Sequence, residues 1–272
     1  TLDLSGTNNA EAIHVCGSVS GTVEWINTDI ITTAAATTLY TNNGSATITQ
    51  EVDTVPEFKM AVASANASKG NVTIKLAANI QLTSAIEINN TYGKNITIDG
   101  ANGNQRYKLT ISSSSRAIHV KQLSGTITFR KLNIVHGGTQ MLLCLGQDSY
   151  TEETTKALTV NMIDMDITST STYKWCLMAT QDLGQFDINM TNVNVDWNGD
   201  TQTVTATKDD ITVIMQNTSR NYIYGNSLCT RFYMPMEDKT TAPQIALLLK
   251  TLWKNKKVCI IEGEGTRLGV GN

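Results

Sequence analysis

The sequence contains little charge, few prolines and no long apolar run. Charged residues make up only 17% of the 272 positions and the net charge is −3, which leaves no basic surface for nucleic acid. No apolar stretch approaches the roughly 20 residues of a membrane-spanning helix. From these absences we expect neither a nucleic-acid partner nor a membrane span.

Cysteine is also scarce, with five residues scattered along the chain and no Cys-x-x-Cys pair. This pattern lacks the spacing of zinc ligands, and we predict neither a metal site nor a cofactor. Cys144, in the run Met141–Leu145, is typical of a small buried apolar residue. The sequence begins at Thr1 without a methionine, as expected of a processed product or an excised fragment.

Threonine and asparagine are abundant instead, with 40 and 24 residues. Threonine favours β-strands, and asparagine favours tight turns because it tolerates left-handed backbone conformations. The composition therefore predicts short strands joined by polar corners, and it argues against a helical bundle.

One pattern recurs along the chain. The pattern begins with two apolar residues separated by one residue of any type. Two polar residues follow, and then the same apolar alternation is repeated. Strands of this kind begin at residues 72, 96, 127, 160, 188 and 213. In addition, segment 12–30 resembles segment 117–134 in two short motifs.

Each such strand has one inward side, and the two polar residues turn the chain at a corner. Stacked units of this length predict a β-solenoid whose coils share one apolar interior. We expect that interior to contain Ile127, Phe129, Leu132, Ile134, Val160, Met162, Met165, Ile167, Ile188, Met190, Val193 and Val195.

A short amphipathic segment, Val55–Ala65, precedes strands at 70–76, 80–82 and 94–100. This order resembles the N-terminal cap and first coils of right-handed parallel β-helix proteins of the pectate-lyase-like superfold, especially bacterial surface-displayed members. The resemblance implies that a helix at about 55–66 caps coils at 72–220. A coil-like unit at 1–31 precedes that helix, and it fits either an upstream solenoid or a docking position elsewhere on the stack.

The period changes after about residue 220. Strands are predicted at 222–224 and 229–234, a helix follows with Pro243 in its first turn, and another strand is predicted at Val258–Ile261. We interpret 221–272 as a small α+β unit, either a lid over the open end of the solenoid or a separate module.

Segment 229–265 resembles the strand–helix–strand part of the OB-fold B subunits of bacterial AB5 toxins, which bind glycans. That resemblance implies a disulfide between Cys229 and Cys259. The fold class expected for the chain is all-β, a right-handed parallel β-helix over 1–220 followed by the small C-terminal cap or module.

Lyases of this superfold resemble pectate lyases in having clustered aspartates for calcium. The clustered acids here are Asp164, Asp166, Asp187 and Asp196. Alignment of the coils predicts one corner row of Lys131, Asp164 and Asn192 and a second row of Asn133, Asp166 and Asn194. We interpret these rows as turn residues that hydrogen-bond the backbone, because Asn and Asp favour such bonds and a lysine disfavours calcium.

The three histidines show no catalytic arrangement. His14 and His119 occupy the same place in the repeat, and strand alternation places both outward. His136 precedes two glycines, and we interpret it as a solvated corner residue. No serine or cysteine partner identifies a triad, and no catalytic residue is predicted.

Aromatic residues outside the repeat are the remaining signal for binding. A specific site on a repetitive wall is expected where the repeat is broken, in the loops at 146–156 and 168–184 and in the C-terminal segment. Aromatic and arginine anchors carry much of the energy of recognition. The predicted ligand-binding residues are Tyr150, Tyr173, Trp175, Gln181, Tyr222, Tyr224, Arg231 and Tyr233.

These observations predict an extracellular or cell-surface protein that is non-enzymatic and adhesin-like and binds a glycan or a host-surface protein. The lack of a paired-acid site favours this interpretation over a polysaccharide lyase or glycoside hydrolase. A second alternative is a structural fibre or virion subunit that stacks end to end or forms homo-oligomers.

Overall fold

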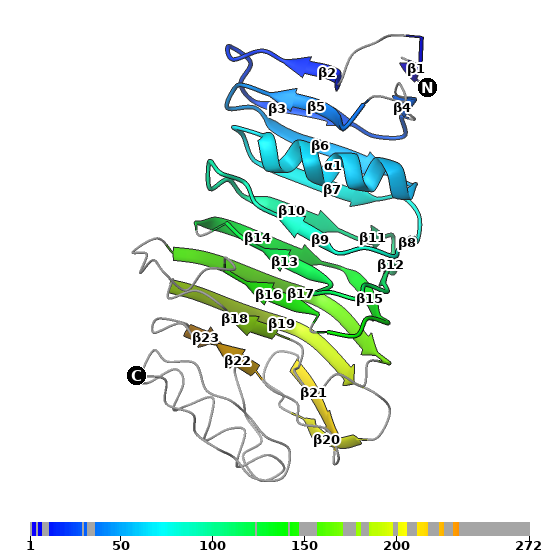
Figure 1. The fold of residues 1–272 in the computed structure, drawn as a ribbon, viewed down its shortest axis with the longest axis vertical. Coiled ribbons are helices and arrows are strands. Elements are labelled where there is room, and N and C mark those ends of the chain that lie inside the picture. Colours follow the sequence, from blue (N-terminus) through cyan, green and yellow to red (C-terminus); the bar gives the residue numbers. More distant parts are fainter. Residues whose placement is uncertain are drawn as a thin grey trace.

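The computed structural model describes residues 2–3, 5–6, 11–28, 30–31, 36–122, 124–140, 142–146, 157–170, 178–180, 185–197, 201–205, 211–216, 223–225 and 231–233. These residues form 23 β-strands and one helix. The strands stack coil upon coil from the N-terminus at the top of Figure 1 to the C-terminal strands near the bottom. The fold predicted from the repeat, a parallel β-solenoid, is confirmed.

The largest sheet has 14 strands and supplies two of the walls of the solenoid. Its strands are β3 (Thr22–Trp25), β6 (Thr47–Val52), β7 (Val72–Leu76), β8 (Ile80–Leu82), β10 (Ile96–Asp99), β11 (Ala101–Asn102), β12 (Gln105–Ile111), β14 (Gly125–Arg130), β15 (Leu132–His136), β17 (Ala157–Ser169), β19 (Gln185–Trp197), β20 (Thr201–Thr205), β21 (Ile211–Gln216) and β23 (Arg231–Tyr233).

A second sheet, called here the short-strand sheet, has five strands and forms a third wall. It contains β9 (Ile86–Ile88), β13 (Ile118–Val120), β16 (Leu143–Leu145), β18 (Met178–Thr180) and β22 (Ile223–Gly225). Two further pairs lie near the N-terminus: β1 (Leu2–Asp3) with β4 (Ile30–Ile31), and β2 (Glu11–Val15) with β5 (Thr38–Asn42).

Equivalent strands of successive coils share one register. Val72 pairs with Ile96, Ile96 with Ile127, Ile127 with Val160, and Val160 with Ile188, always in parallel. This ladder is the one that the spacing of apolar residues predicts. Nine members of the predicted interior are buried: Ile127, Phe129, Leu132, Ile134, Val160, Met162, Met165, Ile167 and Val193. The side chains of Ile188, Met190 and Val195 lie outside the described part of the structure.

The last predicted coil has a different register. Val213 of β21 lies opposite Val195, whereas the repeat places Val213 in line with Ile188. Phe232 of β23 takes the position opposite Ile188. The predicted strand at 213 is present as β21, but its predicted register is wrong. Its sequence matches only the first half of the pattern, and β21 also pairs with the antiparallel strand β20.

The two-residue corners are confirmed at β14–β15 and inside β17. Lys131 and Asp164, each the second residue of a break, have positive φ angles of 51° and 53°. Asn27 has a φ of 51° at the equivalent break of the first coil. A left-handed residue turns the chain within two positions and returns the apolar side inward, and aspartate and asparagine tolerate it well.

The helix α1 (Val55–Ala67) begins where local residues favour a helix start. The hydroxyl of Thr54 accepts a hydrogen bond from the backbone N–H of Glu57, and the backbone N–H of Asp53 donates to the Glu57 carboxylate at 3.3 Å. Pro56 lies in the first turn, where its missing N–H costs nothing. The arrangement is a variant of the capping box, because the Glu57 carboxylate binds the N–H one residue before the N-cap Thr54.

Helix α1 lies inside the stack, between β5 and β9, where other coils place a strand (Figure 1). The Ser64 hydroxyl accepts hydrogen bonds from the backbone N–H groups of Leu39 and Tyr40 at 2.9 and 3.1 Å. On the other side, the Asn66 side chain donates to the Glu87 carbonyl at 2.9 Å. Helical side chains therefore satisfy strand edges that a neighbouring strand would otherwise pair.

The coil-like unit at 1–31 is also part of the stack. Its strand β3 pairs in parallel with β6, with Val23 opposite Ile48. Its strand β2 pairs with β5. Of the two positions left open by the sequence, docking elsewhere on the molecule is therefore ruled out. Among the residues that the structure describes, no helix is long and apolar enough to cross a membrane.

Candidate functional site

Five of the eight predicted ligand-binding residues fall outside the described residues. They are Tyr150, Tyr173, Trp175, Gln181 and Tyr222. The predicted Cys229–Cys259 disulfide and the predicted helix after Pro243 also lie outside them. These assignments stay predictions.

The other three predicted residues lie on two different sheets. Tyr224 of β22 is opposite Ala179 in the short-strand sheet. Arg231 and Tyr233 are alternate residues of β23 in the large sheet, opposite Asp187 and Asn189. The backbone therefore places Arg231 and Tyr233 on the same side of one strand, and it separates them from Tyr224.

Several acids of the solenoid are engaged in ion pairs. Asp99 is 5% exposed, and its carboxylate accepts hydrogen bonds from the Arg130 guanidinium at 2.7 and 2.9 Å and from the backbone N–H of Ala101 at 3.0 Å. Asp166 accepts a hydrogen bond from Arg106 at 2.8 Å. Both carboxylates are therefore committed to contacts within the solenoid.

The corner rows proposed from sequence are real rows. Asp166 lies opposite Asn133 in one neighbouring coil and opposite Asn194 in the other. The backbone N–H of Lys131 donates to the Ile163 carbonyl at 2.9 Å, which places Lys131 beside the Asp164 corner. Within the described residues, no group of three or more His, Cys, Asp or Glu side chains could hold a metal ion.

Two histidines are buried, and the expectation for His136 is wrong. His136 is 0% exposed because it lies opposite Ile111 and follows the alternation of Leu132 and Ile134 into the interior. Its Nδ1 is 2.9 Å from the Ser169 hydroxyl. Burial lowers the pKa of His136 to about 4, so the ring is neutral at pH 7. A pair this deep in the core is structural.

His119 is 5% exposed although strand alternation directs it outward. Its Nε2 lies 2.8 Å from the Gly146 carbonyl, and its Nδ1 lies 3.3 Å from the Arg116 guanidinium. His14, at the same place in the first repeat, is exposed, as predicted, and contacts the Thr41 hydroxyl at 2.8 Å. Strand alternation predicts the direction of both side chains, but it does not predict how much of each is exposed to solvent.

A first cavity, of about 230 Å³, lies beside the start of α1. Three of its lining residues are the acids Glu51, Asp53 and Glu57. Burial, with the neighbouring Asp53, raises the pKa of Glu57 above its ordinary value. However, Glu51 accepts from the backbone N–H of Asn27 at 2.6 Å, and Glu57 accepts from the backbone N–H of Asp53 before the helix. These carboxylates hold the coil and the helix in place.

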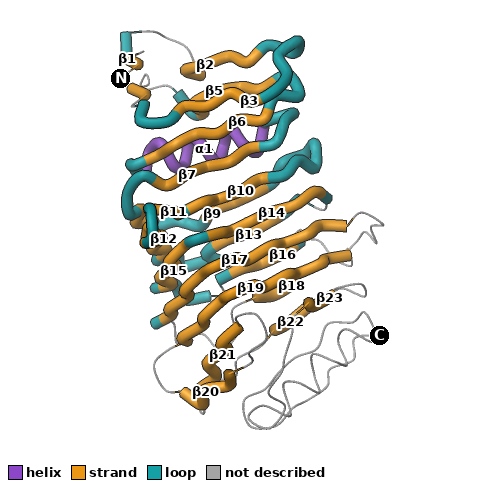
Figure 2. The backbone as a smooth tube through the Cα atoms, turned by 180° about the vertical axis from the view of Figure 1, so that it is seen from behind, coloured by secondary structure: helices purple, strands orange, loops and turns teal. Residues whose placement is uncertain are grey.

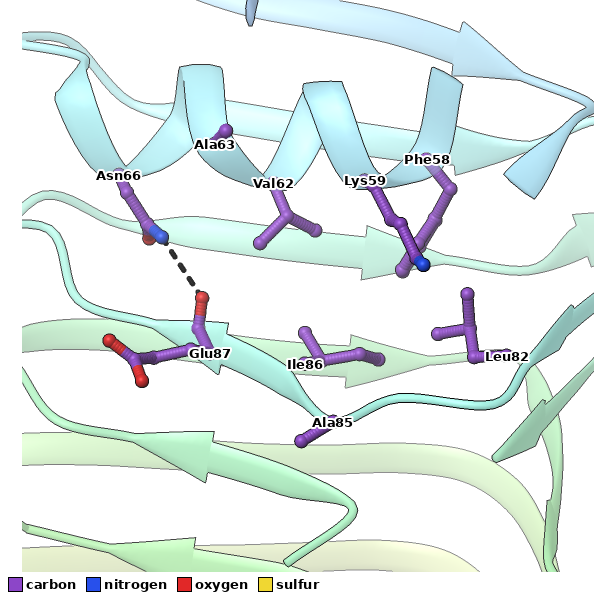
Figure 3. Close-up of a pocket in the computed structure, with 9 residues that line it drawn as sticks. All are labelled: Phe58, Lys59, Val62, Ala63, Asn66, Leu82, Ala85, Ile86 and Glu87. Carbon is purple, nitrogen blue, oxygen red and sulfur yellow. Dashed lines mark hydrogen bonds between the residues drawn. The ribbon is translucent and has the colours of Figure 1, made fainter. Parts of the chain in front are cut away.

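A second cavity, of about 210 Å³, separates the side of α1 from the chain at 82–87 (Figure 3). Val62 and Phe58 of the helix face Ile86 and Leu82 across it, and Asn66 closes one end by its hydrogen bond to Glu87. The Glu87 carboxylate is paired with Lys121 at 2.7 Å. The cavity is a groove left where a helix replaces a strand, and its mainly apolar walls carry no convergent polar groups for catalysis.

The comparisons with known proteins point to the C-terminal segment. The family described as "Glycosyltransferase GT-D fold" matches residues 186–272. A probable glycosyl transferase from Streptococcus gordonii is 43% identical over 49 residues, which are 18% of this chain and 7% of that protein. The glycosyltransferase GlyD from Streptococcus pneumoniae is 41% identical over 49 residues, which are 18% of this chain and 6% of that protein.

The matches therefore cover a small part of each relative, and no solved structure gives a significant match to the chain. The matched family segment begins in β19, which pairs along its length with the solenoid strand β17. It includes β20 to β23 and hence Arg231 and Tyr233.

This match corrects two expectations. The C-terminal segment resembles a glycosyltransferase and not a toxin B subunit. The expectation of a non-enzymatic, adhesin-like protein is wrong for the same reason, and the match indicates neither the lyase or hydrolase nor the fibre alternative. A strand–helix–strand pattern is shared by many unrelated folds, so it does not identify the chemistry of this segment.

Proposed function

We propose that this chain is a glycosyltransferase in which a parallel β-solenoid precedes a sugar-transferring segment of the GT-D type. The match of residues 186–272 to that family carries the proposal. The two streptococcal relatives, both described as glycosyl transferases, support it over their 49-residue alignments. Because the chain spans under a tenth of either relative, only the reaction class is carried over.

The reaction moves a sugar from an activated donor, such as a nucleotide sugar, to an acceptor. An acceptor hydroxyl oxygen bonds to the anomeric carbon, the bond from that carbon to the donor phosphate breaks, and the hydroxyl proton passes to a base. Such a site needs a carboxylate as base or metal ligand and donors for the departing phosphate.

The matched segment contains residues of this kind near its end. The predicted strand Val258–Ile261 is followed by Glu262 and Glu264, which alternate with Gly263 and Gly265. Ligands of α/β units bind beyond the carboxyl ends of strands, and glycines let backbone N–H groups approach a phosphate. We assign the donor site to this stretch.

The aromatic residues predicted for binding fit the same segment. Tyr222, Tyr224, Arg231 and Tyr233 all lie within 186–272. We assign Arg231 and Tyr233, which share one side of β23, to contacts with the sugar or the acceptor. The loop residues Tyr150, Tyr173, Trp175 and Gln181, the cell-surface location and a glycan or surface-protein partner stay predictions.

The test is release of nucleotide from a panel of nucleotide sugars by the full 272-residue chain, with and without divalent cations and glycan acceptors. We expect turnover with one donor, and we expect Glu262→Gln or Glu264→Gln to lower it at least 100-fold. Glu87→Gln, a carboxylate of the solenoid, is the matched control and should retain full activity. Absence of turnover with every donor would overturn the proposed function.

A further inference from the structure

The outward positions of the large sheet form two regular polar rows. We call them the threonine face, and its ten residues are Thr47, Thr49, Asn71, Thr73, Asn95, Thr97, Thr126, Thr128, Thr159 and Asn161. All ten are partly or fully exposed, between neighbours that point into the core. In Figure 2 the strands that carry or directly follow them, β6, β7, β10, β14 and β17, lie side by side, with α1 behind β6 and β7.

Register makes the rows continuous along the solenoid. Thr49 pairs with Thr73, Thr73 with Thr97, Thr97 with Thr128, and Thr128 with Asn161. A hydroxyl or amide therefore recurs at each strand, about every 4.8 Å. The second row is fixed by its own contacts, because the Asn71 side chain accepts from the backbone N–H of Asn95 and the Asn95 side chain accepts from that of Thr126.

The charges that border the threonine face neutralise one another. Glu51, Lys75, Asp99 and Arg130 follow in register with alternating sign. Lys75 lies 3.9 Å from Glu51, and Arg130 lies 2.7 Å from Asp99. A surface of hydroxyls and amides beside paired charges suits an uncharged, hydroxyl-rich ligand, and it offers no field for a polyanion.

The same rows continue into the segment with glycosyltransferase similarity. Thr159 lies opposite Asp187, and Asn161 lies opposite Asn189, both in β19. These two positions are in turn opposite Arg231 and Tyr233 of β23. Residues 186–272 are the matched segment, so one sheet face extends from the second solenoid coil into it.

We propose that the threonine face binds the acceptor, an uncharged glycan chain that lies along the solenoid axis and ends at the transferring segment. This inference rests on the proposed glycosyltransferase function. Hydroxyls of successive sugars exchange hydrogen bonds with successive Thr and Asn side chains, and a rigid row loses little conformational entropy on binding.

The test measures glycan binding without donor, separately from turnover. The full chain is run by native electrophoresis through gels that contain β-1,4-glucan, β-1,3-glucan, α-1,6-glucan or mannan, with polygalacturonate as the charged comparison. We expect retardation by a neutral polymer and none by polygalacturonate. Thr73→Val with Thr97→Val removes two hydroxyls but keeps β-branched side chains of the same size. We expect that pair to weaken binding by about tenfold.

The matched control is Thr110→Val with Thr168→Val, two outward threonines of another wall of the solenoid. That control should bind like the wild type.

If both variants bind equally, or if no neutral polymer binds, the assignment of the threonine face is overturned. Turnover of a nucleotide sugar in the same preparation would still support the proposed transferase function. If only the Thr73 and Thr97 variant loses binding but no donor is turned over, the proposed function is rejected, and with it the role of the bound glycan as an acceptor. A dimer abolished by that pair would assign the face to self-association and overturn the proposal.

Discussion

The two main sheets of the solenoid use their outward positions differently. In the large sheet these positions hold threonines such as Thr73 and Thr97, which stay partly exposed. In the short-strand sheet the equivalent positions hold His119 and Cys144, which are 5% and 0% exposed. Glu87, which lies opposite His119 in the same row, stays exposed. Outward direction and accessibility are therefore separate properties, even within one wall.

The largest expected effect is a difference in stability between two variants of one strand, one at an interior position and one at an outward position. Phe129→Asp should lower the free energy of unfolding by more than about 4 kcal/mol, because it buries an unpaired charge in a fully packed core. Thr128→Asp, one residue earlier and partly exposed, should cost about 1 kcal/mol or less. Urea denaturation followed by circular dichroism measures both. Equal stabilities of the two variants would contradict the assignment of the interior.

A buried polar residue gives the second effect, and it depends on pH. Burial lowers the pKa of His136 to about 4, whereas the unfolded chain has a histidine pKa near 6.5. The unfolded state therefore binds the proton first as the pH falls. The contribution of the neutral ring is complete above pH 6.5 and is lost between pH 6.5 and 4, by up to about 3 kcal/mol.

The measurement is the urea midpoint of the wild type and of His136→Gln at pH 7.5, 5.5 and 4.5. Other groups titrate in both proteins, so the difference between them isolates His136. The wild type should lose more stability than the variant over this range. Parallel pH profiles would show that His136 is not buried as a neutral ring.

A third effect concerns the helix on the short-strand side. Thr54→Ala removes the side chain that accepts from the backbone N–H of Glu57, and it should cost about 1 kcal/mol. Thr83→Ala, at an exposed position between β8 and β9, is the control and should change stability by less than about 0.5 kcal/mol. Thermal unfolding measures the stability of both variants. A Thr54→Ala variant as stable as the wild type would argue against the cap.

The smallest effect is expected on the threonine face itself. Thr73→Val with Thr97→Val should leave the free energy of unfolding within about 0.5 kcal/mol of the wild type, because both side chains are outward and valine favours strands. Calorimetry checks this. A loss of several kcal/mol would give these threonines a structural role and remove their use as binding variants.

Much of the solenoid could be predicted from the sequence because its signal is repeated. The register from Val72 to Ile188 and the corners at Lys131 and Asp164 follow from the spacing of apolar and polar residues. The position of α1 within the stack could not be predicted, since it depends on how Ser64 and Asn66 satisfy neighbouring strand edges. Those bonds connect residues far apart in sequence.

The candidate site was harder to predict for a chemical reason. The left-handed φ angles of Lys131 and Asp164 agree with their interpretation as corner residues. Asp166 instead lies within β17 and pairs with the Arg106 side chain, so its interpretation as a turn residue is wrong. After about residue 220 the chain has no repeat, and the spacing of its acids does not identify a reaction. Its similarity to a family supplied what local physical chemistry could not.

The replacement of a strand by α1 has a mechanical consequence for the molecule. The large sheet runs from β3 through β6 and β7 without a break, whereas the helix divides the strands of the opposite wall into β2–β5 and β9–β22. Backbone hydrogen bonds therefore join the first coils to the rest along one wall, and side chains of the helix join them along another. Residues 11–52 should open as one unit in amide hydrogen exchange, at a lower free energy than the strands from β10 to β17. The solenoid should then bend most easily at α1, which separates these first coils from the strands β9 to β22.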